Sequence, residues 1–478
     1  MKRTLSISLT AVATLAVCAL MLSATSANTG GKKEVTFNKD VAPIFFSNCA
    51  ECHKSNDIAP MSLVTYKEAR PWARSIKEKV VSREMPPWSP DPKYGEFKND
   101  HRLSQKDIDT IVAWVDGGAK EGNPKDLPPA PELANGGWEL GKPDEIYSMK
   151  EEFTVEPGTP DNIQNFVIPT NLKEDRWVQS AEIMPGNKRI VHHVIAFIQT
   201  PEMIAAMKSG QARRRGEQAQ GVFYKEGTLM KVKADAPIID DGCGNANGGS
   251  AFKRPSAGEG GDAFGMFLAG YAPGKGVDIY SDGAAKKAPA GSVIVFQIHY
   301  SSFRGAFEKP EKDRTSLGVH FAKRPPEHSL NTLGIQNHFF KIPAGDANHE
   351  VTACYTFDKD VQLTSYMPHM HLRGKDMKYD VIYPDGKRET LLWVPKFSFN
   401  WQTMYYLKKP VSLPKGTKLI VTAHFDNSSK NKYNPDATKD IRWGDPTYEE
   451  MMIGWMDYYV TDSAKPDKPD ASARSSSK

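Results

Sequence analysis

The chain has 478 residues, more than one hydrophobic core usually organises, so its length favours about three domains. Hydrophobic residues make up 39% of the sequence, and its 34 prolines and 37 glycines favour turns and short strands over long helices. The formal net charge of only +4 argues against nucleic acid as a partner.

The first residues have the features of a secretory signal peptide. A positive start is followed by an apolar run over residues 5–22 and then by small residues suited to cleavage. We therefore predict a signal peptide over residues 1–27, a periplasmic or secreted protein, and no membrane span after signal removal. An uncleaved anchor and a lipoprotein signal that uses Cys18 are the alternatives.

Residues 33–125 are predicted to form a small helical domain. Its last helix begins after Ser104, which suits the N-cap position, carries isoleucine and valine on one face, and ends at Gly117. Residues 126–142 follow, and their prolines and glycines predict a linker.

Beyond the linker, short runs rich in valine, isoleucine, phenylalanine and tyrosine predict antiparallel β-strands. A Pro-Asp-Gly turn at residues 384–386 joins two such runs into a hairpin. Residues 240–262 are rich in glycine and are expected to form a long surface loop. We divide the β region into domains at 143–326 and 327–462, followed by a disordered tail at 463–478. The fold class is therefore multidomain, with a small all-α domain followed by two all-β antiparallel domains.

Cys49, Ala50, Glu51, Cys52 and His53 form a C-x-x-C-H motif. In this motif the two thiols bond covalently to haem and the histidine binds the iron. A structural disulfide or half of a zinc site is the weaker interpretation, because no second cysteine pair could complete the zinc ligands. The sequence therefore predicts a cytochrome c-like domain with one covalently bound haem c.

A second axial ligand is expected from the opposite face of the haem. Met85 is our choice, because the prolines after it stiffen an extended segment that can hold its thioether on the iron. Met61 is the second choice, since it follows His53 by only eight residues. Packing in the core is the alternative for both methionines. A His53 and Met85 pair would favour electron transfer over oxygen binding, because both axial positions are filled.

Seven of the ten histidines beyond the linker lie in paired motifs or on predicted strands. His369 and His371 form an H-x-H pair, and residues two apart on a strand point to the same face, roughly 6 to 7 Å apart. Such a pair suits copper, zinc or iron, and a thioether as third ligand favours copper. His192 and His193 are adjacent, so they can share a metal only where their strand ends or bulges.

Four motifs together resemble those of the copper type II ascorbate-dependent monooxygenases, the family of peptidylglycine α-hydroxylating monooxygenase and dopamine β-monooxygenase. The resemblance covers residues 143–460 and rests on the adjacent histidine pair, the strand at 296–300, the H-x-H pair and residues 448–451. It implies two jelly-roll domains, each with one copper ion, on either side of a solvent-filled cleft.

The resemblance also assigns ligands to each of the two copper ions. Those of the electron-donating copper would be His192, His193 and His299. Those of the oxygen-activating copper would be His369, His371 and Met451. Strand phase could favour Met452 in place of Met451, but the preceding Glu450 favours Met451.

The positions that hold the peptide substrate in the amidating members of the family differ here. Those members have an arginine two residues before the H-x-H pair and an asparagine and a tyrosine after the ligand methionine. This chain has Met367, Ile453 and Trp455 there. A small, apolar substrate is therefore expected in place of a peptide. Cys354 stands where the family has one half of a disulfide, and it could pair with Cys243, or both could remain thiols.

We predict an enzyme, an exported haem- and copper-containing monooxygenase that hydroxylates a C–H bond of an unknown small molecule with O2. The cytochrome domain is expected to pass electrons to the copper of the first histidine set, in place of or beside a small reductant or redox partner. A non-catalytic electron-transfer or copper-binding protein is the alternative. His320, His338 and His424 match no ligand position and are expected to be structural.

Overall fold

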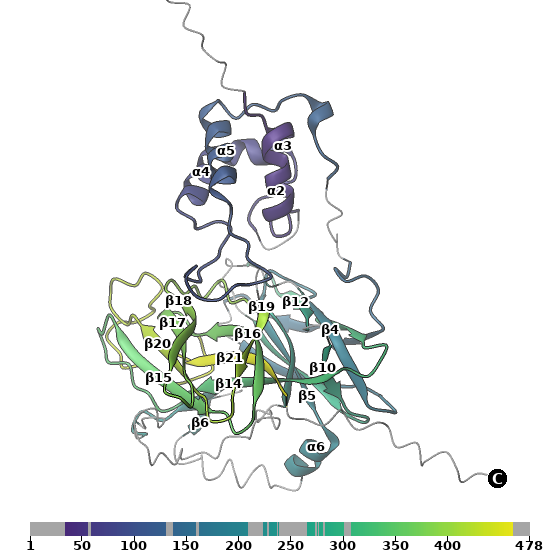
Figure 1. Cartoon of the computed structure of the whole chain (residues 1–478), viewed down its shortest axis with the longest axis vertical. Coiled ribbons are helices and arrows are strands. Elements are labelled where there is room, and N and C mark those ends of the chain that lie inside the picture. Colours follow the sequence, from purple (N-terminus) through teal and green to yellow (C-terminus); the bar gives the residue numbers. More distant parts are fainter. Residues whose placement is uncertain are drawn as a thin grey trace, which may run out of the picture.

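The computed structural model describes residues 34–55, 59–130, 137–158, 162–208, 223–226, 229–236, 238, 265–272, 275, 277–280, 283–300 and 307–461. The predicted signal peptide, the glycine-rich stretch and the predicted tail lie outside these residues. A small helical domain stands above a larger body of β-sheets (Figure 1). Within the described residues, no helix is long and apolar enough to cross a membrane.

The helical domain is built from short helices around an aromatic core. Its elements are η1 (Phe37–Val41), α2 (Ala42–Asn48), α3 (Tyr66–Ala69), η2 (Arg70–Trp72), α4 (Ala73–Val81), α5 (Gln105–Asp116) and η3 (Pro124–Asp126). The rings of Phe37 and Phe45 lie 5.8 and 6.3 Å from the ring of Trp114 on α5. The predicted last helix is confirmed by α5, because the Ser104 side chain caps its N-terminus and Gly117 is its C-cap.

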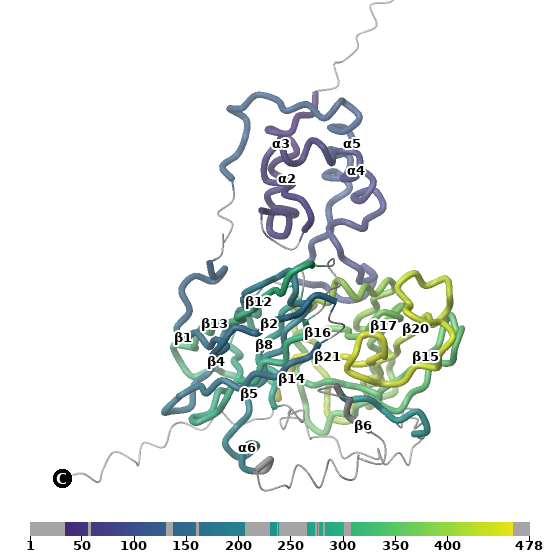
Figure 2. The backbone as a smooth tube through the Cα atoms, turned by 180° about the vertical axis from the view of Figure 1, so that it is seen from behind, coloured from purple at the N-terminus to yellow at the C-terminus, as the bar shows by residue number. Residues whose placement is uncertain are grey.

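One stretch of the predicted helical domain is not helical. Residues 86–99 follow α4, cross to the β body and pack on it, and we call them the docked segment. Prolines at positions 86, 87, 90 and 92 prevent a helix here. Phe97 instead forms an antiparallel β-bridge with Leu407 of the β body. The chain then returns to the helical domain and forms α5 (Figure 2).

The β body contains the strands of both predicted β domains. Those of the first are β1 (Glu145–Ser148), β2 (Phe153–Val155), β3 (Asn162–Pro169), β4 (Arg176–Met184), β5 (Val191–Gln199), β6 (Phe223–Glu226), β7 (Leu229–Val232), β8 (Met266–Tyr271), β9 (Asp278–Ile279), β10 (Ala284–Ala288), β11 (Val293–Tyr300), β12 (Glu311–Asp313) and β13 (Ser316–Phe321), with α6 (Pro201–Lys208) after β5. Those of the second are β14 (His328–Gln336), β15 (His349–Thr356), β16 (Val361–His369), β17 (Gly374–Ile382), β18 (Arg388–Val394), β19 (Tyr405–Leu413), β20 (Lys418–Phe425) and β21 (Ile453–Val460). The predicted hairpin is confirmed by β17 and β18, which pair antiparallel around a turn where Gly386 has a φ of 85°.

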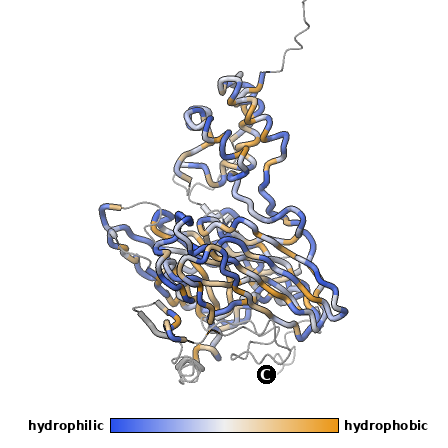
Figure 3. Tube along the Cα trace, turned by 90° about the vertical axis from the view of Figure 1, so that its left-hand side faces the viewer, coloured by the Kyte–Doolittle hydropathy of each residue, from blue (hydrophilic) through white to orange (hydrophobic). Residues whose placement is uncertain are grey.

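The described strands form one long sheet, two four-stranded sheets that cover it, and two two-stranded sheets, β2 with β12 and β6 with β7. The long sheet has the order β1-β13-β4-β10-β14-β21-β16-β19, with β9 beside β4. The four-stranded sheets are β3-β11-β5-β8 and β15-β20-β17-β18. Two separate cores of buried apolar side chains lie between these layers, one in each β domain. Apolar and polar positions alternate along many of the strands (Figure 3).

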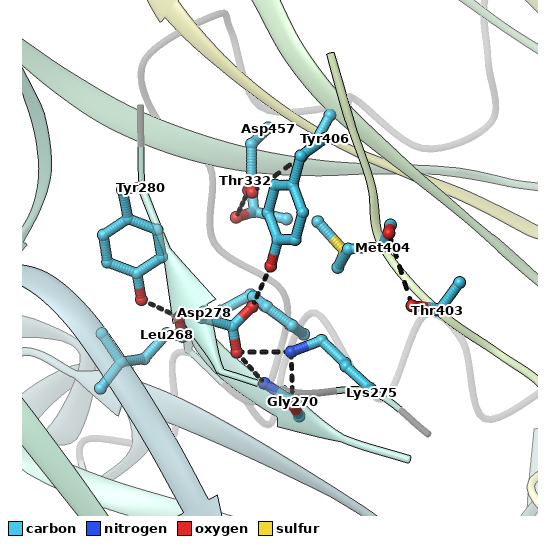
Figure 4. Close-up of polar contacts among 12 residues, drawn as sticks. Leu268, Gly270, Lys275, Asp278, Tyr280, Thr332, Thr403, Met404, Tyr406 and Asp457 are labelled. Carbon is cyan, nitrogen blue, oxygen red and sulfur yellow. Dashed lines mark hydrogen bonds and ion pairs between the residues drawn. The ribbon is translucent and has the colours of Figure 1, made fainter. Parts of the chain in front are cut away.

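The two β domains share the long sheet, which the sequence did not predict. β10 and β14 pair in parallel, with Ala284 opposite His328, whereas their outer neighbours pair antiparallel. Buried polar groups also bond across this junction. Asp278 accepts hydrogen bonds from Lys275 of the first domain at 2.6 Å and from Tyr406 of the second at 2.9 Å (Figure 4). The junction is therefore part of the folded core and not a flexible link.

Candidate copper and haem sites

The first histidine set comes from two neighbouring strands, β5 and β11. His193 lies opposite His299, but the next pair is Tyr300 with Val191, so the ladder skips His192. This irregularity is the bulge that the adjacent histidine pair requires, because it turns both rings toward one point. Ligand atoms of all three histidines lie within 4.8 Å of one another.

The first set is largely buried. His192 and His299 are almost completely buried, at 4% and 0% exposed. Burial, together with the charges of the neighbouring histidines, holds the pKa of His193 well below its usual value. Neutral imidazole is the form that binds a metal ion. The three rings therefore form a ready site for one cation.

The second set lies at the end of β16. His369 is the last residue of this strand, so His371 lies beyond its end. The sequence predicted both histidines of the H-x-H pair within a strand. The two rings remain close, with centroids 5.4 Å apart. His369 Nδ1 lies 2.6 Å from Gln402 Oε1, and His371 Nδ1 lies 3.2 Å from the Glu449 carbonyl oxygen. With Nδ1 of each ring facing an oxygen atom, Nε2 is the nitrogen that would bind a metal ion.

Glu450 fixes the backbone of the second set. Its carboxylate accepts hydrogen bonds from the backbone N–H groups of His371, at 2.8 Å, and Arg373, at 2.6 Å. The side chain is fully buried, and this burial raises the pKa of Glu450 to about 8. Sequence reasoning used Glu450 only to choose between two methionines and missed this role, because both bonds connect residues far apart in the chain.

The structure separates the two candidate methionine ligands. Met452 is fully buried in the main core of the second β domain. Met451 is only partly buried and packs both on the edge of that core and on a small apolar cluster beside the histidines. We define the apolar cluster by its buried members, which are Met367, Met404, Ile453 and Trp455. Met451 is therefore better placed than Met452 to reach a metal ion.

Three members of the apolar cluster, Met367, Ile453 and Trp455, occupy the positions that bind the peptide substrate in the amidating members of the family described above. Met367 lies opposite Trp455 in the pairing of β16 with β21, and Ile453 lies opposite His369. Trp455 also meets Phe267 of the first β domain, with ring centroids 5.8 Å apart. The surroundings of the second set are therefore apolar on this side, as predicted.

The two histidine sets lie against each other. The ring centroids of His193 and His369 are 6.3 Å apart. Phe399 stacks on His192 at 4.5 Å and 17°, and its centroid lies 6.1 Å from that of His371. The resemblance implied a solvent-filled cleft between two separate sites, but here side chains close the space between these rings. Phe399 and Gln402 belong to one loop between β18 and β19, and no sequence signal pointed to either.

The C-x-x-C-H motif lies at the end of α2. The His53 N–H donates to the Cys49 carbonyl oxygen at 2.8 Å, which folds the motif into one turn. Burial, and then the neighbouring Cys52, raises the pKa of the Cys49 thiol to about 12. His53 Nδ1 lies 3.1 Å from the Met61 carbonyl oxygen, which leaves Nε2 for an axial bond. These features fit a covalently bound haem.

The two candidate haem methionines differ in their surroundings. Met61 is partly buried against the helical core, and its carbonyl oxygen lies on the His53 side of the motif. Met85 is 42% exposed, so core packing does not account for it. Met85 also comes directly before the docked segment. Met61 lines a hollow beside the motif together with Lys54 and Ser55, so Met85 as the second axial ligand stays a prediction.

The remaining histidines and cysteines have structural surroundings. His424 lies between two carboxylates, with Nδ1 2.9 Å from Asp376 and Nε2 3.3 Å from Glu350. The His338 ring packs on Trp443, and His320 lies on β13. Cys354 is disulfide-bonded, whereas Cys243 lies outside the described residues.

One comparison with known proteins covers the part of the chain that contains the second set. Residues 332–473 match the family model for the copper type II ascorbate-dependent monooxygenase, C-terminal domain. This range contains His369, His371 and Met451 but not the first histidine set. A search of curated proteins finds no match.

Solved structures add only distant likenesses. PNGF-II has 10% identity and a TM-score of 0.28, over 66% of this chain and 65% of that chain, slightly less than two thirds of its length. The major capsid protein P2 from bacteriophage PM2 has 7% identity and a TM-score of 0.23, over 66% and 100%. The cowpea mosaic virus top component has 6% identity and a TM-score of 0.26, over 69% and 93%. Such scores carry no argument, so the comparison rests on residues 332–473, which match the family model for the copper type II ascorbate-dependent monooxygenase, C-terminal domain.

Proposed function

We propose that the protein is an exported monooxygenase that uses two copper ions and one haem c to hydroxylate a small, apolar molecule. The observation that carries this proposal is the meeting of two histidine sets from two β domains, the second of them inside the matched domain. One oxygen atom of O2 enters a substrate C–H bond. The other leaves as water after uptake of two electrons and two protons.

The second set is the proposed reaction site. Copper held by His369, His371 and Met451 would activate O2, while copper held by the three histidines of the first set would store an electron. Gln402 and the Glu449 carbonyl hold the two rings of the second set in one tautomer. Phe399 covers the space between the sets and excludes water from it. Exclusion of water limits the escape of reactive oxygen species into solvent.

The apolar cluster supports the proposed substrate class. It lies beside Met451 and presents methionine, isoleucine and tryptophan where the resembling enzymes hold a charged peptide end. A buried apolar wall binds an uncharged substrate and penalises a carboxylate, because a buried charge needs a partner. We therefore expect hydrophobic small molecules as substrates.

The helical domain is the proposed source of electrons. Cys49, Cys52 and His53 would hold the haem, with Met85 as the sixth ligand, and a low-spin haem of this kind would pass single electrons. Ascorbate or another small reductant could serve the copper ions beside it. The predicted signal peptide supports export, and a compartment outside the cytoplasm suits both a c-type haem and the disulfide of Cys354.

A test of this proposal starts with metal content. The full chain would be produced in a host that attaches c-type haem, loaded with copper, and analysed for copper and haem. We expect about two copper ions per haem, because the chain offers two nitrogen- and sulfur-rich ligand sets. His299→Ala and His371→Ala should each lose one copper ion, and His424→Ala, the control at a histidine outside both sets, should lose none.

The second step separates hydroxylation from electron transfer alone. Copper-loaded protein and a panel of hydrophobic substrates would be incubated with labelled O2, and products examined by mass spectrometry. Label in a hydroxylated product that is lost in His371→Ala supports the proposal. Haem turnover with no labelled product across the panel would favour the alternative, an electron-transfer protein, which the replaced peptide-binding residues also allow.

A further inference from the structure

The docked segment connects the haem domain directly to the second copper set. The backbone N–H of Lys98 donates to the Tyr406 carbonyl oxygen at 2.7 Å, and that of Lys408 donates to Glu96 at 2.8 Å. The Asn99 side chain bonds on both sides of Tyr405: it donates to the Met404 carbonyl oxygen at 2.7 Å and accepts from the Tyr406 N–H at 3.2 Å. The segment is therefore paired like an added strand along the start of β19.

Buried aromatic rings fill the contact between the docked segment and β19. Trp88 and Tyr405 are 8% and 3% exposed, and their ring centroids lie 5.1 Å apart at 88°. Phe97 packs beside them, 5.6 Å from Tyr405. Trp88 follows the candidate haem ligand Met85 by only three residues. One end of this aromatic contact is therefore tied to the proposed haem.

The other end reaches the proposed oxygen-activating site. Tyr405 follows Met404, which is 1% exposed and belongs to the apolar cluster that packs on Met451. Figure 4 shows the Met404 side chain close to Tyr406. Gln402, which holds His369, is two residues further back in the same loop. Short stretches of chain thus connect the Trp88–Tyr405 ring contact to Met85, three residues before Trp88, and to Met404 of the apolar cluster, directly before Tyr405.

We propose that Trp88 and Tyr405 form the electron path from the haem to the copper of the second set. The inference rests on the proposed function and differs from the expectation that electrons enter at the first set. In this step a ferrous haem loses one electron and one Cu(II) ion gains it to become Cu(I), with no bond made or broken. Close-packed rings carry electrons better than a gap or solvent, and the covalent tether keeps their geometry fixed.

Single-electron kinetics on the full, haem- and copper-loaded chain test this path. A photochemical donor would reduce the haem in the absence of O2, and haem absorbance would report its reoxidation by Cu(II). We expect Trp88→Leu and Tyr405→Leu to lose the fast phase of reoxidation, and Trp88→Phe to keep it. Tyr94→Leu is the matched control, because Tyr94 belongs to the same segment but packs on Trp393, with centroids 6.5 Å apart.

The haem reduction potential and the copper content of each variant would be measured alongside. A variant that loses docking or metal should differ from the parent protein in these two quantities, whereas a variant that loses only the electron path should not. The point of entry is tested with one-copper variants. The fast phase should survive in His299→Ala and disappear in His371→Ala. A fast phase that persists in Trp88→Leu, or that requires His299, overturns the inference while the proposed hydroxylation stands. Failure to bind haem or copper overturns the proposed function itself.

Discussion

Three candidate ligand histidines share one arrangement at the level of single atoms. His53, His369 and His371 each direct Nδ1 toward an oxygen atom, which belongs to Met61, Gln402 and Glu449 respectively. A bond at Nδ1 fixes the tautomer and the ring plane, so that Nε2 points toward the metal. The oxygen acceptors are therefore part of each site even though they would not contact the metal.

Gln402 provides the sharpest test of this arrangement. Gln402→Leu keeps the size of the side chain but removes the oxygen that holds His369. We expect copper affinity of the second set to fall by about 10- to 100-fold, as for other residues that orient metal ligands. Competition with a chelator measures this affinity. Asn400→Leu, at an exposed position of the same loop, is the control, and an equal loss in both variants would refute the role of Gln402.

Glu450 should matter for folding as well as for the site. Glu450→Ala leaves the N–H groups of His371 and Arg373 without their acceptor and removes the carboxylate nearest to a buried arginine. We expect a loss of roughly 2–5 kcal/mol in the free energy of unfolding, measured by chemical denaturation. Glu450→Gln should lose less, because it keeps one acceptor oxygen.

Glu449→Gln is the matched control for Glu450. The Glu449 side chain forms an ion pair with Lys231 at 3.9 Å. Its replacement by glutamine should cost less than the loss of Glu450, because it is the Glu450 carboxylate that accepts the hydrogen bonds from the backbone of the second set. Equal losses at both positions would mean that Glu450 has no special structural role.

The parts of the site that could be predicted from the sequence are those whose residues form a short sequence motif. The H-x-H pair, the adjacent histidines and the C-x-x-C-H motif are short patterns with a known chemistry, and the structure brings each of them into a compact group. Phe399 and Gln402 gave no signal, because a lone phenylalanine or glutamine in a loop is chemically ordinary. Their roles arise only from contacts with histidines more than 25 residues away in sequence.

At the level of elements, the parallel pairing of β10 with β14 depends on a buried ion pair. Lys286 lies 3.3 Å from Asp457, and both side chains are less than 10% exposed. Lys286 also donates to Thr332 at 2.8 Å, and Ser365 donates to Asp457 at 3.0 Å. Hydrogen bonds to neighbouring hydroxyl groups offset part of the cost of burying two charges.

Removal of one partner of the Lys286–Asp457 ion pair should lower the free energy of unfolding. Lys286→Met leaves the Asp457 charge buried without its cation, and we expect the free energy of unfolding to fall by about 3–5 kcal/mol. The double variant Lys286→Met, Asp457→Asn should be more stable than the sum of the single losses predicts. Lys287→Met is the control, since its ion pair with Asp175 is about half exposed and should be worth under about 1 kcal/mol. Additive losses in the double variant would contradict a coupled pair.

Helices and strands were predicted correctly where the residues that determine their structure lie within the same segment. α5 and the β17–β18 hairpin carry their own caps and turn residues, so their sequences predict them. The sequence predicts the docked segment as part of a helical domain. In that prediction, the prolines after Met85 serve only to support Met85 as a haem ligand. The true structure of the segment depends on hydrogen bonds with β19, more than 300 residues away, which no local pattern reveals.

At the level of the whole molecule, three candidate redox sites are held in one frame. The shared sheet fixes the two β domains, and the docked segment attaches the helical domain to the second of them. Sequence patterns predicted the three parts but not their arrangement, because relative placement depends on surfaces that form only after each part has folded. The family resemblance even implied the wrong spacing, with a cleft where His193 and His369 are in contact.

This closed arrangement leads to a magnetic prediction. If copper binds both sets while the rings of His193 and His369 stay 6.3 Å apart, two Cu(II) ions lie near enough for their electron spins to interact. The fully oxidised protein should then give a broadened electron paramagnetic resonance spectrum. The one-copper variants His299→Ala and His371→Ala provide the reference, because each should give the sharp signal of an isolated ion. If the spectrum of the intact protein equals the sum of those two signals, the sets are separated in solution and electrons must cross a gap between them.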